Sequence, residues 1–400
     1  MARGDHTHGG GKLMVVAGTR PEAIKLAPLI VELRRRGLPV TVCATGQHRE
    51  LFDQAMAYFN LEPDIDLALM RPGQSVDGFM ARALAALGPL LRAEQPDMVV
   101  VQGDTATAYA AALAAFYAQI PVAHVEAGLR SGDITDPFPE EFHRRQISQI
   151  ADQHFAPTAS AQAALLAEGV APERIYLTGN TGIDALHQMT ARLASDPRLA
   201  EPVASRLAAF GGGRKLMLAT IHRRENHGAV LNAMIDAVIR LARFGDLDIL
   251  IPVHPHPLVH DRLRQSLGGV ANVHLLAPLS YPELIHLLQQ ARLVLTDSGG
   301  IQEEAPALGC PALVLRRTTE RPEGLGTGNA RLVRADPDVI VEEVRRIVDR
   351  NDSHAAMASV VSPYGDGRAT QRIANILESH LGWPGSLSNE LKPQAEAVPV

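Results

Sequence analysis

One pattern recurs along most of the chain: a short, unbroken apolar run followed by a longer segment with apolar residues at helical spacing. In the first half these runs are KLMVVAG (12–18), VTVCATG (40–46), DMVVVQGD (97–104) and IPVAHVEAG (120–128). Strands that are apolar along their whole length are typical of a parallel sheet covered by helices on both faces. Aromatic residues make up only 4% of the chain, which also disfavours a β-sandwich. The pattern predicts an α/β fold.

A second series of runs indicates a second domain, as expected for 400 residues. Its runs are KLMLATIH (215–222), LDILIPVHP (247–255), VHLLAPL (273–279), RLVLTDSGG (292–300) and PALVLR (311–316). The first series continues through HFAP and RIYLTGN to about residue 187, and the stretch from His187 to Gly213 has no strand signal and ends in three glycines. We expect Rossmann-like domains over 13–187 and 214–365, a linker region over 188–213, and a helix over 366–381 that returns to the first domain.

Composition limits the location and the partners. The ends, 1–12 and 383–400, are expected to be a disordered leader and a disordered tail. The leader has no apolar core of a secretory signal, and no run approaches the length of about 20 apolar residues that a membrane span needs. A net charge of −6 argues against nucleic acid as a partner. Two distant cysteines, Cys43 and Cys310, suggest a reducing compartment, so we expect a cytoplasmic protein.

The strongest local signal is DSGGIQEE (297–304), which follows an apolar run and opens a helix. Ser298, Gly299 and Gly300 could present backbone N–H groups to a diphosphate, and Glu304 could accept hydrogen bonds from ribose hydroxyls. An ordinary capped helix with acidic residues in its first turn explains the motif equally well. The first strand ends in GTRP, with one glycine, so no dinucleotide fingerprint and no bound NAD are expected.

Cations and carboxylates lie at other strand ends. Arg20 and Lys25 follow the first run, and His222 and Arg321 follow runs of the second domain, so a diphosphate held between the domains is predicted. A solvated turn is the alternative for the residues that surround His222. Three acids are candidates for catalysis. Asp104 and Glu126 each end an apolar run, and Glu140 lies on the next loop. One such acid is often a helix cap, whereas three suggest acid–base chemistry. HPHP (254–257) lacks further ligands at metal-binding spacing, so no metal is expected.

The chain resembles the non-hydrolysing UDP-N-acetylglucosamine 2-epimerases from about residue 13 to 380. The shared motifs are GTRPEAIKLAP, TGQHRE, QGDTATA, HVEAGLRSGD, PFPEE, FAPT, GNTGIDAL, HRREN, DSGGIQEEAPALG, TTERPE and PYGDGRA. The resemblance implies two facing Rossmann-like domains of glycosyltransferase-B type, with the active site in the interdomain cleft. It also implies a homodimer, no cofactor, and a product that serves as a cell-surface polysaccharide precursor.

Residue by residue, the resemblance assigns three groups of positions. Catalysis falls on Asp104, Glu126, Glu140 and His222, and UDP binding falls on Arg20, Lys25, Ser298, Gly299, Gly300, Glu304 and Arg321. Gln47 and Arg49 fall where some members bind a second nucleotide sugar.

The implied reaction is reversible conversion of UDP-N-acetylglucosamine to UDP-N-acetylmannosamine through 2-acetamidoglucal and UDP. A hydrolysing 2-epimerase and an epimerase of a related UDP-diacetamido uronic acid remain open. A glycosyltransferase would need an acceptor site, and a non-catalytic nucleotide-sugar sensor would not need all three acids.

Overall fold

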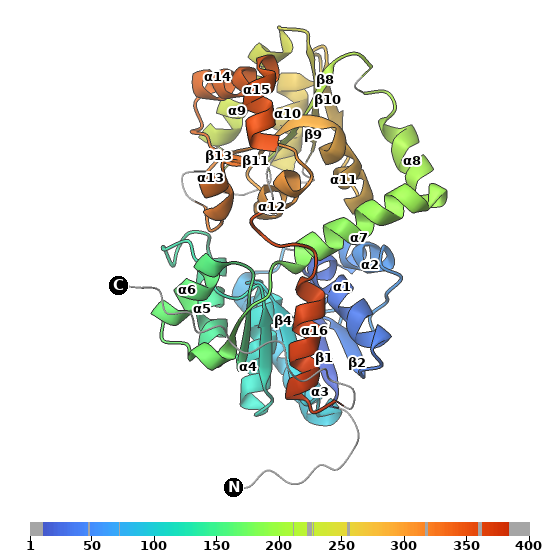
Figure 1. Cartoon of the computed structure of the whole chain (residues 1–400), viewed down its shortest axis with the longest axis vertical. Helices are drawn as coiled ribbons and strands as arrows, with labels where there is room; N and C mark the ends of the chain where they lie inside the picture. The colour runs from blue at the N-terminus through green and yellow to red at the C-terminus, as the bar shows by residue number, and fades with distance from the viewer. Residues whose placement is uncertain are drawn as a thin grey trace. The chain divides into compact units, whose positions relative to one another are not determined.

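In the computed structural model the chain divides into two compact α/β units (Figure 1). Unit 1 is Met1–Ala185 with Tyr364–Val400, and unit 2 is Leu186–Pro363. The structure describes residues 11–46, 49–71, 73–210, 212–221, 226, 228–253, 257–316, 319–358 and 362–383. The expected leader, apart from its last two residues, and nearly all of the expected tail therefore lie outside the described residues.

Unit 1 is built on one parallel sheet in the order β3-β2-β1-β4-β5-β6-β7. Its strands are β1 (Leu13–Ala17), β2 (Val40–Ala44), β3 (Ile65–Asp66), β4 (Met98–Gln102), β5 (Val122–Val125), β6 (Gln153–Ala156) and β7 (Ile175–Leu177). Its helices are α1 (Arg20–Arg35), α2 (Arg49–Ala57), α3 (Val76–Glu94), α4 (Ala106–Tyr117), α5 (Glu140–Ile150), α6 (Ala159–Ala167) and α16 (Ala369–His380), with a 3₁₀ turn at Pro172–Arg174. The central strands β1 and β4 are buried at every position, which is why their sequence is continuously apolar.

Unit 2 repeats this plan with a parallel sheet in the order β10-β9-β8-β11-β12-β13. Its strands are β8 (Lys215–Thr220), β9 (Leu247–Pro252), β10 (Val273–Leu276), β11 (Ala291–Thr296), β12 (Ala312–Val314) and β13 (Ala330–Leu332). Its helices are α8 (Pro197–Leu207), α9 (Ala229–Ala242), α10 (Pro257–Leu267), α11 (Tyr281–Gln290), α12 (Gly299–Ala307), α13 (Glu323–Thr327), α14 (Pro337–Asp349) and α15 (Asn351–Ala358). Separate apolar clusters cover the two faces of this sheet. The predicted fold class, two parallel-sheet α/β domains, is confirmed.

The boundary between the units differs from the expected linker. Residues 188–213 are largely helical, because α7 (Thr181–Ser195) runs on from unit 1 and α8 follows it. Both Val203 and Leu207 of α8 are buried in the apolar cluster of unit 2. The segment is therefore part of unit 2 rather than a connector, since its apolar face has a sheet to pack against.

Each sheet reverses its strand order at one point, between β1 and β4 in unit 1 and between β8 and β11 in unit 2. Loops at the carboxyl ends of strands at such a switch point form the usual ligand crevice of this fold. In unit 2 the Oγ1 atoms of Thr220 and Thr296 lie 2.6 Å apart and join the ends of β8 and β11. Within the described residues, no helix is both long and apolar enough to cross a membrane.

Candidate active site

The turn from β1 into α1 is closed by a buried glutamate. Thr19 caps the helix, and the carboxylate of Glu22 accepts hydrogen bonds from the backbone N of Gly18 at 3.0 Å and of Thr19 at 2.8 Å. The hydroxyl of Thr105, after β4, donates to the same carboxylate at 2.6 Å. Burial raises the pKa of Glu22. The carboxylate of Glu22 thus accepts hydrogen bonds from the backbone N–H groups that would otherwise bind an anion at this helix start.

Asp104 follows β4 and is held by an arginine from α5. The Nε atom of Arg144 lies 3.0 Å from Oδ2 of Asp104, and its Nη1 lies 3.2 Å from Oε2 of Glu141. The Arg144 side chain is 1% exposed, whereas that of Asp104 is 29% exposed. Arg144 therefore fixes a carboxylate that solvent still reaches, as a proton-transfer group requires.

Glu126, directly after β5, pairs with Lys25 of α1, and both side chains are buried. The backbone of Glu126 is left-handed, with φ of +63°, a strained conformation for a residue with a side chain. A Cβ atom on Gly103 would lie 3.8 Å from Oε1 of Glu126, so this carboxylate lies against the residue before Asp104. The structure thus brings together Lys25, Glu126 and the Asp104 loop.

Two histidines bind the backbone of the Asp104 loop. His124 on β5 hydrogen-bonds the carbonyl oxygen of Gly103 through Nε2 at 2.8 Å, and His143 on α5 hydrogen-bonds that of Asp104 through Nδ1 at 2.9 Å. Burial lowers the pKa of His124 to about 3 and also lowers the pKa of His143. Both rings are therefore neutral near pH 7 and position the loop by hydrogen bonding.

In unit 2 the DSGG motif forms the start of α12, as expected. Ser298 is the N-cap, with its Oγ atom 3.5 Å from the backbone N of Ile301, and its own backbone N donates to Oγ1 of Thr296 at 3.0 Å. Among the described residues, no partner is found for the backbone N–H groups of Gly299 and Gly300. These two donors stand at the positive end of the helix and could bind an anion.

Arg321 lies directly over this helix start. A Cβ atom on Gly299 would come within 2.7 Å of Nη1 of Arg321, so only glycine leaves room for the guanidinium. Nε of Arg321 contacts Oε1 of Glu303 at 2.6 Å, and Nη1 pairs with Glu320. Glu320 is shared with Arg316, which lies 2.6 Å from its other oxygen. The arginine expected to face a phosphate is therefore oriented by buried carboxylates.

The remaining predicted residues are less closely tied to these groups. Glu140 is the first residue of α5, Arg20 is the first residue of α1, and Glu304 lies in the middle of α12; all three are half-buried. Arg49 is largely exposed and pairs with Asp66 at 3.1 Å. His222 and Gln47 lie outside the described residues.

Several residues that sequence reasoning did not select also shape the candidate site. They are Glu22, Glu141, Arg144, Asn226, Glu303 and Glu320. Asn226 donates to Oδ2 of Asp297 at 2.9 Å from within the HRREN motif. Most belong to quoted motifs, so the motifs located them, but only tertiary contacts show which member is buried and paired.

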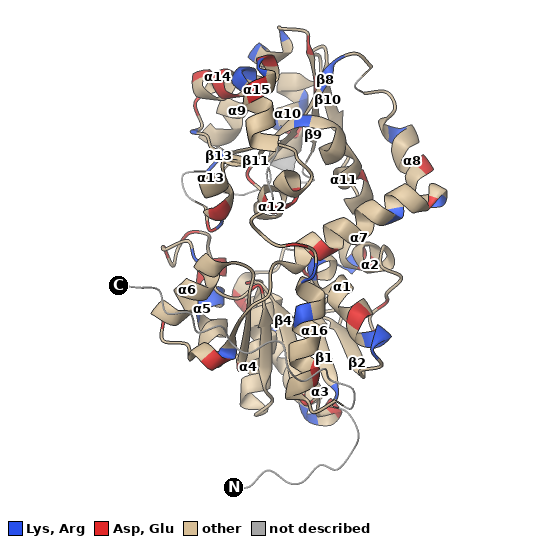
Figure 2. Cartoon of the chain, in the orientation of Figure 1, with Lys and Arg blue, Asp and Glu red and all other residues tan. Residues whose placement is uncertain are grey.

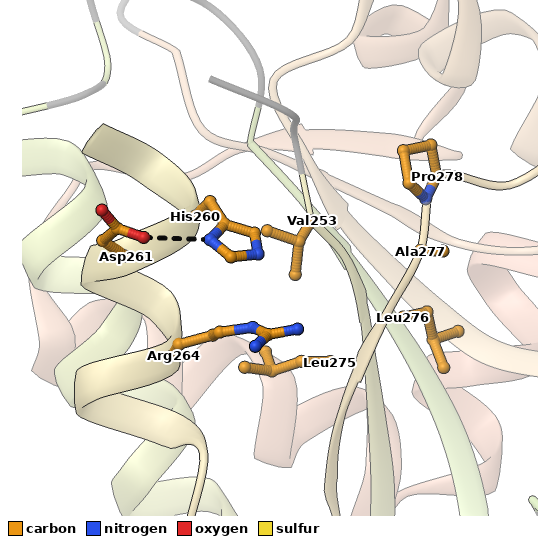
Figure 3. A pocket seen from close by; sticks show the side chains of 8 residues that line it. All are labelled: Val253, His260, Asp261, Arg264, Leu275, Leu276, Ala277 and Pro278. Carbon is orange, nitrogen blue, oxygen red and sulfur yellow. Dashed lines mark hydrogen bonds and ion pairs between the residues drawn. The ribbon is translucent and has the colours of Figure 1, made fainter. Parts of the chain in front are cut away.

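A cavity of about 490 Å³ lies elsewhere in unit 2, between α10 and the ends of β9 and β10 (Figure 3). It is lined by His260, Asp261, Arg264 and apolar residues that include Val253 and Leu275. None of the predicted site residues lines it. The described residues also contain no group of three or more His, Cys, Asp or Glu side chains placed to hold a metal ion.

Comparison with known proteins defines first the fold and then the family. The two parallel sheets, with polar groups at their carboxyl edges, are those of glycosyltransferase-B-type proteins. A glycotransferase of kitacinnamycin covers 93% of this chain with a TM-score of 0.60 at 17% identity, a likeness that shows the fold alone.

The profile described as UDP-N-acetylglucosamine 2-epimerase matches residues 31–378. The UDP-N-acetylglucosamine 2-epimerase of Escherichia coli (strain K12) is 44% identical over 371 residues, which are 92% of this chain and 99% of that protein. The crystal structure of UDP-GlcNAc 2-epimerase from Neisseria meningitidis bound to UDP-GlcNAc is similar, with a TM-score of 0.89 and 39% identity over 92% of this chain and 100% of that one. The chain belongs to the UDP-N-acetylglucosamine 2-epimerase family.

Proposed function

We propose that this chain interconverts UDP-N-acetylglucosamine and UDP-N-acetylmannosamine by eliminating UDP and adding it back, without cofactor or metal. Family membership supports the substrate and the position of the chemistry. The observation that carries the proposal is the pair of carboxylates at the ends of the adjacent strands β4 and β5, Asp104 and Glu126, each held by a cation.

The reaction needs a proton to leave C2 of the sugar, which is not acidic in the intact substrate. Loss of UDP from C1 withdraws electrons from C2, so a carboxylate can take the C2 proton as the C1–O bond breaks. The products of this step are 2-acetamidoglucal, with a C1–C2 double bond, and UDP. A UDP oxygen then re-forms the bond to C1 while a protonated acid delivers hydrogen to the opposite face of C2.

We assign this proton transfer to Asp104, Glu126 and Glu140 with His222. Partial exposure and the Arg144 contact support Asp104, and the contact with Lys25 supports Glu126. We also assign Lys25, which pairs with Glu126, to stabilising the charge on the departing diphosphate.

The nucleotide is assigned chiefly to unit 2. The N–H groups of Gly299 and Gly300, with Ser298 and Arg321, would hold the diphosphate, and Glu304 would bind the ribose. Arg20 and Lys25 of unit 1 complete the proposed set. Preorganised donors of this kind stabilise the charge that develops on a leaving group.

Cleavage of the C1–O bond gives a direct test. UDP-N-acetylglucosamine with oxygen-18 in the bridge between C1 and the β-phosphorus is incubated with the protein and recovered. Elimination predicts that the label moves into non-bridging β-phosphate positions of recovered nucleotide sugar. A label that stays in the bridge after many turnovers rules out elimination.

Three further parts of the proposal extend beyond the reaction. Gln47 and Arg49 would contribute to a second nucleotide-sugar site, and the protein would be a cytoplasmic homodimer, as the family resemblance implies. A product used for cell-surface polysaccharide would fit this location. Light scattering after size-exclusion chromatography tests the dimer, and UDP-sugar binding stoichiometry with and without Arg49→Ala tests the second site.

A further inference from the structure

A second cavity in unit 2, of about 410 Å³, lies at the opposite edge of the sheet from the start of α12. Its walls come from the beginnings of β8 and β11, the carboxyl ends of α11 and α12, and α15. We propose that this cavity binds a small phosphate-bearing anion, separately from the UDP-sugar.

The charge of the lining carries this proposal. Arg214, Lys215, Arg292 and His354 all line the cavity, and none of the described residues lining it is acidic. Lys and Arg positions are visible beside β8 and α15 in Figure 2, where acidic residues of α14 and α15 also occur. Phosphate groups are bound in proteins by such convergent cations.

The partners of these cations are mostly neutral. Nε of Arg214 donates to the carbonyl oxygen of Gly245 at 3.0 Å, and Nζ of Lys215 donates to that of Val348 at 2.6 Å. Two carboxylates lie near these cations: Asp246, which pairs with Arg345 at 2.8 Å and also interacts with the charge of Lys215, and Asp248, 3.5 Å from Nη1 of Arg214. Asp248 is buried and also contacts His274 at 3.1 Å, so it neutralises at most part of the positive charge.

Arg292 distinguishes an anion site from simple helix capping. Cations are often found at the carboxyl ends of helices, where they stabilise the helix dipole. This role explains the position of Lys215 beside the end of α14. Arg292 donates from Nη2 to Oδ1 of Asn351 at 2.8 Å, but its Nε is buried without a hydrogen-bond partner among the described residues. Because this Nε has no accessible surface, an anion in the cavity would contact the outer nitrogens of the guanidinium, one of which Asn351 holds in place.

The size and the remaining walls favour an organic phosphate over a bare ion. A volume of about 410 Å³ falls in the range of small-molecule sites. Phe210, Leu216 and Leu288 supply apolar contact area beside the cations. Burial, and next the charge of Arg292, lowers the pKa of His354, against a hydrogen bond to the backbone of Arg292 that raises it. A neutral His354 ring contributes contact area to the cavity but no charge.

The test measures binding of inorganic phosphate and of phenyl phosphate by calorimetry, with chloride balancing the ionic strength and UDP added to occupy the substrate site. Arg292→Gln should weaken binding of both anions about ten-fold, the cost of one charge-assisted contact. Arg264→Gln, which removes a cation from the other cavity, should bind both anions like the wild type. Phenyl phosphate should bind more tightly than inorganic phosphate.

Arg214→Gln provides a second variant, because this side chain is about half exposed and its loss should not affect folding. It too should weaken binding. Equal affinities in the wild type and both cavity variants would overturn the proposal, as would a signal that chloride reproduces. Because epimerisation is measured separately, a failure here leaves the proposed function untouched.

Discussion

At the scale of single residues, the candidate site contains two pairs of adjacent glutamates with divided roles. Glu141 is buried against Arg144, and Glu303 is buried against Arg321. Their neighbours Glu140, at the start of α5, and Glu304, in the middle of α12, are half-buried. The sequence shows two equivalent acids in each motif, and only the arginine delivered by tertiary folding separates them. The buried member positions an arginine, and the proposed function assigns the other member to the substrate.

Exchanging each member of the first pair for glutamine should separate these roles. Glu140→Gln should lower kcat about 10²–10⁴-fold, because a proton carrier is lost, with nearly unchanged stability. Glu141→Gln should cost about 3 kcal/mol of unfolding free energy, because it breaks a buried ion pair. Steady-state kinetics and urea unfolding of both variants give the comparison. Full turnover in Glu140→Gln would remove Glu140 from the proposed chemistry.

Glu22 leads to a prediction about pH. Burial raises its pKa above the ordinary 4.5, against the lowering effect of its hydrogen bonds from Thr105, Gly18 and Thr19. The folded state therefore holds this proton more tightly than the unfolded state. Relative to Glu22→Gln, the contribution of the carboxyl group to stability should be complete below pH 4.5 and lost as the pH rises through the folded-state pKa.

Urea unfolding of the wild type and Glu22→Gln across this range measures the difference directly. The wild type should lose stability relative to the variant as the pH rises. If the wild type instead gained stability relative to the variant as the pH rises, the hydrogen bonds would lower the pKa of Glu22 by more than burial raises it.

At the scale of elements, α1 and α12 both start after a Thr or Ser N-cap but differ in what occupies the first turn. At α1, the N–H groups of Gly18 and Thr19 bind the carboxylate of Glu22. At α12, Glu303 turns instead to Arg321, and the glycine N–H groups remain available. TRPE forms a capping box, and Thr105, the N-cap of α4, donates a further hydrogen bond to the carboxylate of Glu22.

The two glycines of α12 should respond differently to alanine. In Gly299→Ala the new Cβ meets Nη1 of Arg321 at 2.7 Å, and two glutamates hold that side chain in place. Overpacking of this kind should cost about 1–3 kcal/mol. In Gly300→Ala the nearest atom is Oε2 of Glu304 at 3.9 Å, an ordinary contact, so stability should be retained. Equal unfolding midpoints for Gly299→Ala and Gly300→Ala, measured without ligand, would show that Arg321 is not held against Gly299.

At the scale of the whole molecule, the sequence was sufficient for the two parallel sheets because their strands are apolar throughout. It was insufficient for the boundary, since α7 is one continuous helix across the two units and carries no break at Ala185. The acids of strands β4 and β5 could be placed at one edge from topology alone. Their partners Arg144 and Lys25 could not be predicted, because both lie on helices whose rotation about the helix axis is determined only by packing.

The last helix, α16, belongs to unit 1 through contacts made across the whole chain. Oδ1 of Asp184 accepts hydrogen bonds from the backbone N of Thr370 at 2.9 Å and from its hydroxyl at 2.6 Å, and Oδ2 accepts from the backbone N of Ala369 at 3.1 Å. Asp184→Ala should therefore lower the unfolding free energy by about 2–4 kcal/mol. Asp366→Ala, which removes an exposed pair with Arg372, should cost under about 1 kcal/mol. Similar losses in chemical unfolding would mean that Asp184 does not anchor the helix.

The central claim is reversible proton exchange at C2 of an otherwise intact UDP-sugar. The most direct measurement incubates the purified protein with UDP-N-acetylglucosamine alone in deuterated water and follows both epimers by nuclear magnetic resonance. The account predicts UDP-N-acetylmannosamine in equilibrium with the starting sugar, deuterium at C2 of both, and loss of exchange in Asp104→Asn or Glu126→Gln. Unchanged substrate, an epimer that retains its original C2 hydrogen, or free N-acetylmannosamine with released UDP would contradict it.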